Sequence, residues 1–259
     1  KISTGAKSTK FGVDFKDARN IYEKLHNLDY INPVGLAVHI GSQIFDFNYF
    51  LQAYSHLKSL ADDLRKHNFH VPRLDLGGGI GINYDNNKSP NFTEYKKIIS
   101  NLFENTDYEL SFEPGRSLIA EAGILVTKVI RNKKAVDKNF IIVDVGMNNL
   151  IRPTLYDAFH IIEPVIKNVN LPITADIVGP ICETGDYIAL NRTINNVQNE
   201  DLLAIRTTGA YSSVMSSNYN ARANANEIII HDNKDHLIKE SETIEKLINK
   251  EKVVRFTEN

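Results

Sequence analysis

Apolar residues follow two alternating patterns in the first half of the chain. Three segments carry apolar side chains three and four positions apart, which predicts amphipathic helices at residues 14–28, 50–64 and 92–102. Short apolar runs lie between and after these segments and predict strands at residues 34–40, 73–76 and 108–112. The first run is apolar nearly throughout, which predicts a strand buried on both faces. Strands and helices that alternate in this way indicate a parallel sheet or an α/β barrel.

The pattern changes after about residue 122. Short apolar runs separated by turn residues predict strands at residues 124–131, 140–145, 173–178, 187–190, 202–208 and 227–231. Helical spacing returns only at residues 241–250. We therefore expect a partial α/β barrel over residues 1–122, followed by a mostly β domain over residues 123–259.

Composition excludes several classes of protein. The chain has 259 residues, 42% of them hydrophobic, and a formal net charge of −2, so no general positive field recruits nucleic acid or an anionic membrane. No apolar run approaches the roughly 20 residues that span a bilayer. The single cysteine, Cys182, cannot form an internal disulfide, which fits a reducing cytoplasm. We expect a cytoplasmic protein that binds neither nucleic acid nor membrane.

Each predicted strand of the first unit ends in residues that suit chemistry rather than packing. These strand-end loops are residues 39–43 (His-Ile-Gly-Ser-Gln), 77–81 (Gly-Gly-Gly-Ile-Gly) and 113–116 (Glu-Pro-Gly-Arg). In an α/β barrel the carboxyl ends of the strands meet at one rim, where active sites lie. Successive glycine N–H groups suit a phosphate, and a guanidinium can bind a phosphate or a carboxylate with two hydrogen bonds. The loops therefore predict an anion site at this rim.

Structural explanations stay open for each of these features. The glycines are compatible with a tight turn, His39 with a core histidine, and Glu113 and Arg116 with a surface ion pair. A dinucleotide-binding loop is disfavoured, because Ile82 stands where its third glycine is required. Cys182 is compatible with an inert buried thiol, although polar residues follow it.

Taken together, the motifs resemble the fold-type III pyridoxal-phosphate-dependent decarboxylases. The resemblance depends on nine segments in a fixed order: residues 1–5, 10–12, 39–43, 75–82, 113–118, 144–156, 179–186, 209–211 and 215–220. It implies that the first unit is the C-terminal part of a (β/α)8 TIM-like barrel and that a β-sandwich or barrel-like domain follows. It also implies a homodimer with shared active sites, in which Cys182 and Glu183 serve the partner's cofactor.

The resemblance implies pyridoxal 5'-phosphate as cofactor and gives roles to matching residues, with no metal. His39 would stack on the pyridine ring and Glu113 would pair with the ring nitrogen. The phosphate would be surrounded by Ser42, Gly78, Gly79, Gly115, Arg116 and Tyr211. The substrate would contact Arg116, Arg152, Tyr156, Glu183 and Tyr211. Cys182 would donate the proton that replaces the departing carboxyl group.

Within the family, the segments are most similar to members that convert meso-2,6-diaminopimelate to L-lysine and CO2, the last step of lysine biosynthesis. Two arginines and a carboxylate suit the amino and carboxylate groups at the far end of that substrate. A diamine precursor such as ornithine would leave Arg152 and Arg116 without a carboxylate to bind. Decarboxylases of the carboxynorspermidine, arginine or ornithine type are the alternatives within the family.

The sequence departs from the family pattern in several places. No lysine matches the one that anchors the cofactor, which leads us to expect that about the first third of a family member is missing. A non-catalytic cofactor-binding fragment is therefore a second alternative. Asn149 replaces a usual acidic residue, Ser212 replaces a usual glycine, and residues 221–223 replace a usual Arg-Pro turn.

Overall fold

The computed structural model describes residues 10–85, 89–167 and 169–254, so the resembling segment at residues 1–5 lies outside the described residues. The chain divides into two compact units, Lys1–Glu121 and Ala122–Asn259. Within the described ranges, no helix is both long and apolar enough to cross a membrane.

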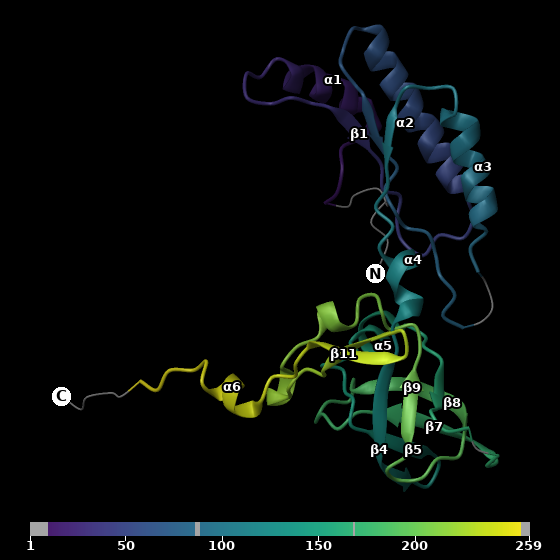
Figure 1. Cartoon of the computed structure of the whole chain (residues 1–259), viewed down its shortest axis with the longest axis vertical. Helices are drawn as coiled ribbons and strands as arrows, with labels where there is room; N and C mark the ends of the chain where they lie inside the picture. Colours follow the sequence, from purple (N-terminus) through teal and green to yellow (C-terminus); the bar gives the residue numbers. More distant parts are fainter. Residues whose placement is uncertain (1–9, 86–88, 168, 255–259) are drawn as a thin grey trace. The chain divides into compact units, whose positions relative to one another are not determined.

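The first unit is a small parallel sheet covered by helices (Figure 1). Its sheet contains three strands in sequence order: β1 (Gly35–Ala37), β2 (Arg73–Asp75) and β3 (Glu109–Ser111). The helices are α1 (Phe15–His26), α2 (Asn48–Lys66), α3 (Phe92–Phe103), the short α4 (Arg116–Ile119) and the 3-10 turn η1 (Ala120–Ala122). Capping fixes two helix starts, because Asp14 accepts from Lys16 N and Asn91 accepts from Glu94 N. The predicted alternation of helices and strands is confirmed.

Strand register explains which face of this sheet packs against the helices. Leu36, Leu74 and Leu110 are paired across the three strands, and all three contribute to the core formed with the helices. Their neighbours along the strands point the other way, and Ala37 is exposed. The prediction that residues 34–40 form a strand buried on both faces is therefore wrong for the described chain. Helices of this unit cover one face only of a strand that is three residues long.

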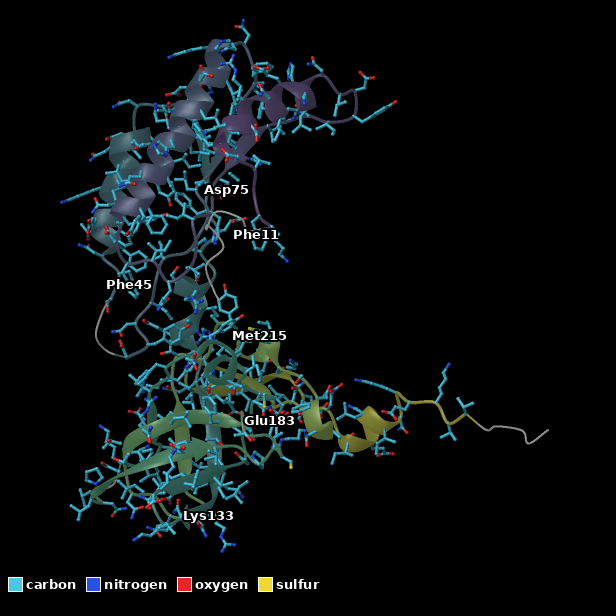
Figure 2. The ribbon with its side chains drawn as sticks, turned by 180° about the vertical axis from the view of Figure 1, so that it is seen from behind. Phe11, Phe45, Asp75, Lys133, Glu183 and Met215 are labelled. Atoms are coloured by element: carbon cyan, nitrogen blue, oxygen red, sulfur yellow. The ribbon has the colours of Figure 1, made fainter. Side chains whose placement is uncertain are left out.

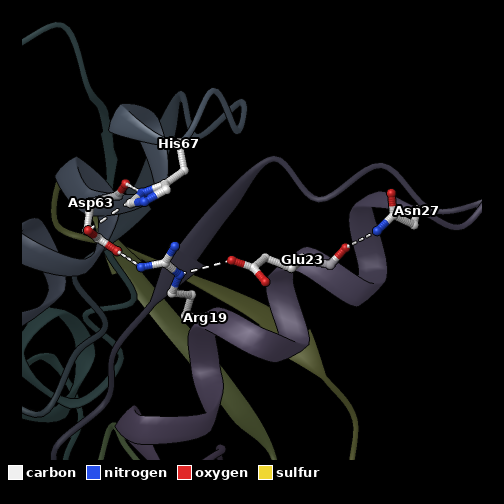
Figure 3. A network of polar contacts seen from close by, with 5 residues as sticks. All are labelled: Arg19, Glu23, Asn27, Asp63 and His67. Carbon is white, nitrogen blue, oxygen red and sulfur yellow. Dashed lines mark hydrogen bonds and ion pairs between the residues drawn. The ribbon is translucent and has the colours of Figure 1, made fainter.

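Polar contacts join α1 to α2 at the surface of the first unit (Figure 3). Arg19 Nε donates to Glu23 Oε1 at 2.9 Å, and Arg19 Nη1 donates to Asp63 Oδ2 at 3.0 Å on the neighbouring helix. His67, the residue that follows α2, has its Nδ1 2.8 Å from the carbonyl oxygen of Asp63, four positions earlier. Exposed ion pairs of this kind contribute about 0–1 kcal/mol each, so the apolar core is the main source of stability.

The second unit is a nearly closed, mostly β structure. Its six-stranded sheet has the order β6-β9-β4-β5-β7-β8, and only the β5–β7 pair is parallel. The strands are β4 (Leu125–Lys134), β5 (Asn139–Val143), β6 (Ile162–Pro164), β7 (Pro172–Val178), β8 (Tyr187–Asn195) and β9 (Leu202–Ile205). The end strands β6 and β8 also lie against each other, which nearly closes the sheet around an aliphatic core.

Shorter elements lie outside this sheet. They are α5 (Arg152–Tyr156), η2 (Ser213–Met215), η3 (Tyr219–Ala221), the hairpin β10 (Glu227–His231) with β11 (Lys234–Lys239), and α6 (Ile244–Ile248). Sequence patterning missed β6, β11 and α5. A three-residue strand is too short to show alternation, and β11 has a mixed polar composition.

Two isoleucines of the second unit provide a matched test of where its stability originates. Ile177 in β7 is fully buried, whereas Ile166 is 83% exposed. Ile177→Ala should lower the free energy of unfolding by about 2–5 kcal/mol, because it leaves a cavity in the core. Ile166→Ala should change it by less than about 0.5 kcal/mol. Denaturant unfolding measures both, and equal effects would contradict this description of the core.

Candidate functional site

Parallel hydrogen bonding brings the three strand-end loops together in the first unit. Val38 N donates to Asp75 O at 3.0 Å, and Leu76 N donates to Ser111 O at 2.9 Å. Beyond the strands, Glu113 N donates to Gly77 O at 2.9 Å. The segments that follow β1, β2 and β3 therefore begin side by side at one edge of the sheet.

Close backbone contacts explain the glycines in the middle loop. A Cβ on Gly78 would lie 2.1 Å from the carbonyl oxygen of Glu113, and one on Gly79 would lie 2.2 Å from that of Gly41. Gly79 also has φ +100°, which side chains rarely tolerate. Packing alone thus requires glycine at both positions. Gly115 differs, because a Cβ there would meet no atom within 4 Å.

Arg116 connects the first and third loops. It opens α4 and is only 8% exposed. Its Nη2 donates to Ser42 Oγ at 3.1 Å, and its Nη1 donates to the Tyr84 hydroxyl at 2.7 Å. A guanidinium and a hydroxyl are groups that bind phosphate oxygens. Tyr84 was not predicted as a site residue, because it lies in a polar segment without a recognisable motif.

His39 and Glu113 are both exposed. Because the His39 side chain is exposed in this chain, the interpretation of His39 as a core histidine is wrong. Its imidazole Nδ1 lies 3.5 Å from Gly78 N. Among the described residues, Glu113 has no ion-pair partner, so a surface ion pair between Glu113 and Arg116 is not formed. The His39 ring and the Glu113 carboxylate are therefore both accessible at the edge of the sheet.

Two further side chains hold the loops in place. The Gln43 side-chain amide makes two hydrogen bonds to the backbone of Ile82. Gln43 Nε2 donates to Ile82 O at 2.7 Å, and Ile82 N donates to Gln43 Oε1 at 3.2 Å. Asp75, labelled in Figure 2, accepts from Gly77 N at 2.7 Å and from Ser111 Oγ at 2.8 Å. Both residues lie inside the motifs at residues 39–43 and 75–82, but only their contacts show that they support the loops.

Cys182 lies on an exposed loop of the second unit, residues 179–186, so the inert buried thiol is excluded. The buried carboxylate of Asp186 organises this loop. It accepts from Ile181 N and Met147 N, each at 2.6 Å. A Cβ on Gly179 would lie 2.3 Å from the same carboxylate. Asp186 therefore fixes the loop to the turn at residues 146–147, with charge-assisted hydrogen bonds.

Glu183, also labelled in Figure 2, has a phenol partner. The Tyr219 hydroxyl donates to Glu183 Oε2 at 2.8 Å. This hydrogen bond and the charge of the carboxylate raise the pKa of Tyr219, and Cys182 acts in the same direction. Cys182, Glu183 and Tyr219 thus form one polar group at the surface of the unit. Tyr219 lies within the motif at residues 215–220, but its role was not predicted.

Arg152 and Tyr156 lie on α5, which packs against the Cys182 loop. Thr154 Oγ1 donates to Gly185 O at 2.5 Å and fixes the two together. Arg152 is 6% exposed, so an exposed loop arginine is excluded. Tyr156 is half-buried. Tyr211 lies on the loop after β9 with a left-handed backbone (φ 60°), and its side chain is 42% exposed.

The predicted site residues therefore fall into two sets, one in each unit. The first unit contains His39, Ser42, Gly78, Gly79, Glu113, Gly115 and Arg116, which offer donors for an anion and an accessible ring. The second unit contains Arg152, Tyr156, Cys182, Glu183 and Tyr211, which offer a thiol, a carboxylate and a guanidinium. Acid–base chemistry and anion binding are thus each supported by one set.

Gly79→Ala and Gly115→Ala form a matched pair that tests the loop geometry. The first should lower the free energy of unfolding by about 1–3 kcal/mol or more, because it combines a left-handed φ with a backbone clash. The second should change stability by less than about 0.5 kcal/mol, because its methyl group enters open space. Thermal and denaturant unfolding measure both. A destabilised Gly115→Ala would show that this space is not open.

Comparison with known proteins places these loops in a family context. A family sequence model described as "Pyridoxal-dependent decarboxylase, C-terminal sheet domain" matches residues 19–209. The chain is 42% identical over 248 residues to a diaminopimelate decarboxylase of Aquifex aeolicus, covering 95% of this chain and 59% of that protein. It is 43% identical over 244 residues to one of Neisseria meningitidis serogroup A, covering 94% and 60%.

Solved structures of diaminopimelate decarboxylases have the same fold. The Helicobacter pylori structure, complexed with L-lysine, has a TM-score of 0.90 at 35% identity and covers 96% of this chain and 62% of that chain. The M. jannaschii structure, also in complex with L-lysine, has a TM-score of 0.92 at 33% identity and covers 98% and 60%. The chain thus spans about three fifths of the length of these relatives.

Proposed function

Because the chain belongs to the pyridoxal-dependent decarboxylases, we propose that it is part of an enzyme that converts meso-2,6-diaminopimelate to L-lysine and CO2. The observation that carries this proposal is the 42% identity to a curated diaminopimelate decarboxylase over 95% of the chain. The reaction is a carboxy-lyase reaction and would be the last step of lysine biosynthesis. The single exposed cysteine supports a cytoplasmic location.

We propose that residues 1–122 are the C-terminal part of a (β/α)8 barrel that binds the cofactor. The consecutive parallel order of β1, β2 and β3, with a helix after each of the first two strands, supports this assignment. Residues 123–259 would be the mostly β domain that carries the Cys182 loop. The two compact units, Lys1–Glu121 and Ala122–Asn259, support a boundary near this position.

The strand-end loops fit pyridoxal 5'-phosphate. The fit depends on two observations: the Arg116 guanidinium and its Ser42 partner are groups that can bind a phosphate, and a Cβ on the neighbouring Gly115 would meet no atom within 4 Å. Backbone N–H groups of Gly78 and Gly79 lie on the neighbouring loop, and Tyr211 would complete the phosphate site. His39 would stack on the ring and Glu113 would hold the ring nitrogen protonated. When bound, the cofactor ring accepts the electron pair that decarboxylation leaves at Cα.

The substrate would be recognised by its distal amino and carboxylate groups. Arg152 would bind the carboxylate, together with Arg116 and Tyr156, while Glu183 would bind the distal amino group beside Tyr211. The Tyr219 hydroxyl already directs Glu183 Oε2. A receptor with two guanidiniums favours diaminopimelate over ornithine, which has no distal carboxylate.

Cys182 would deliver the proton to Cα after CO2 leaves. Its exposed position on a loop fixed by Asp186 supports this role, because a proton donor must approach the reacting carbon at a defined angle. The thiol and the anion-binding loops belong to different units of the chain. We propose that two copies form a homodimer in which Cys182 and Glu183 complete the partner's site.

Release of CO2 from a panel of amino acids tests the reaction. The intact protein with pyridoxal 5'-phosphate should release CO2 from meso-diaminopimelate and form L-lysine, with ornithine, arginine and lysine as poor substrates. Cys182→Ala should lower kcat by roughly 100-fold or more, the usual contribution of a general acid. Cys182→Ser is the conservative control for folding. Preferred decarboxylation of ornithine or arginine would contradict the proposed substrate.

Mixed dimers test the shared sites. A Cys182→Ala subunit and an Arg116→Ala subunit are each expected to be nearly inactive alone. In a heterodimer, one site has both an intact Arg116 and an intact Cys182, so activity should recover to about a quarter of wild type after random mixing. No recovery in purified heterodimers would show that each chain completes its own site.

A further inference from the structure

His160 is a histidine that the proposed mechanism does not use. It lies between α5 and β6, and its side chain is fully buried. Its Nε2 lies 2.9 Å from Arg152 Nη1, and its Nδ1 lies 2.9 Å from the carbonyl oxygen of Arg206. Both ring nitrogens therefore contact polar groups, and one of these is the guanidinium assigned to the distal carboxylate.

The chemistry of these contacts fixes the proton on the ring. A guanidinium only donates hydrogen bonds, so His160 Nε2 must accept from Arg152. A carbonyl oxygen only accepts, so Nδ1 must carry the hydrogen and donate to Arg206 O. His160 is thus a neutral imidazole that binds the arginine through its lone pair. Because a neutral acceptor adds no negative charge, this hydrogen bond orients the guanidinium without neutralising it.

Neighbouring elements hold the imidazole itself in place. Asp157 has a left-handed backbone (φ 54°) that ends α5 and turns the chain, so His160 returns toward Arg152. Arg192 Nη1, from β8, donates to His160 O at 2.9 Å, and its guanidinium lies 3.8 Å from the Phe159 ring centroid. Arg206 N donates to Ile161 O at 2.9 Å. Three segments therefore support this histidine.

We propose that His160 is a positioning residue that holds the Arg152 guanidinium in the orientation that binds the substrate's distal carboxylate. The inference rests on the proposed function, because that function gives Arg152 its ligand. If His160 has this role, it affects substrate affinity only through the binding of the substrate's distal carboxylate. Loss of an oriented hydrogen bond to a charged group should weaken binding by about 10-fold or more.

Two substitutions of the intact protein separate the two hydrogen bonds. His160→Gln can place an amide oxygen near the position of Nε2 and keeps an acceptor for Arg152. His160→Asn is shorter and keeps a donor for Arg206 O but loses that acceptor. We expect His160→Asn to raise KM for meso-diaminopimelate about 10-fold with kcat changed less than about twofold, and His160→Gln to recover most of the affinity.

Inhibitor binding identifies the group that is recognised. L-lysine retains the distal carboxylate, whereas cadaverine is the same diamine without it. His160→Asn should raise the inhibition constant of L-lysine by the same factor as KM and leave that of cadaverine unchanged. Ile141→Val, a conservative change in the core of the same unit at a residue that is 0% exposed, controls for lost stability and should change neither.

The outcomes separate the inference from the proposed function. A wild-type protein that does not decarboxylate diaminopimelate would overturn both. Normal activity with unchanged KM and L-lysine inhibition in the folded His160→Asn variant would overturn the inference alone. The inference would also be overturned if His160→Asn weakened the binding of L-lysine and cadaverine equally. It would likewise be overturned if His160→Gln were impaired as much as His160→Asn, since either pattern indicates a merely structural role.

Discussion

The parallel pairing of β1, β2 and β3 is the constraint on which the candidate anion site depends. The sheet is small, with three residues in each strand, but its register places three loops from distant parts of the sequence at one edge. Backbone carbonyls of Gly41 and Glu113 then approach so closely that the middle loop tolerates only glycine at positions 78 and 79. The same approach brings Arg116 to Ser42, which lies 74 positions earlier in the chain. The need for glycine at positions 78 and 79 and the contact between Arg116 and Ser42 therefore both follow from the register of the three strands.

Buried polar side chains perform the corresponding task in the second unit. Asp186 fixes the Cys182 loop with two backbone hydrogen bonds, and His160 contacts Arg152. Each has its polar atoms committed to partners inside the unit, as buried polar groups require. The groups that they support, Cys182 and Arg152, are those assigned to proton transfer and carboxylate binding. Hydrogen bonds from supporting side chains to the residues that act on the substrate hold those residues within a narrow range of positions.

Single residues show where sequence reasoning was sufficient and where it was not. Helical spacing located α1, α2 and α3, because an amphipathic helix repeats its pattern over several turns. The same reasoning overestimated the burial of β1, since an apolar run does not reveal which of its faces is covered. For Arg152, the sequence left an exposed loop position open, and the side chain is buried. His160 carried no signal at all, because its importance comes from two contacts made after folding.

The order of helices and strands, the motifs and the family could all be predicted from the sequence, because they depend on local periodicity and on residue identity. Three properties became visible only in the folded chain: Cys182 is exposed, Gly115 borders open space while Gly78 and Gly79 do not, and His160 contacts Arg152. These properties depend on distances between segments far apart in the chain. Such distances follow from the packing of the whole unit, which no local pattern of hydrophobic and polar residues specifies.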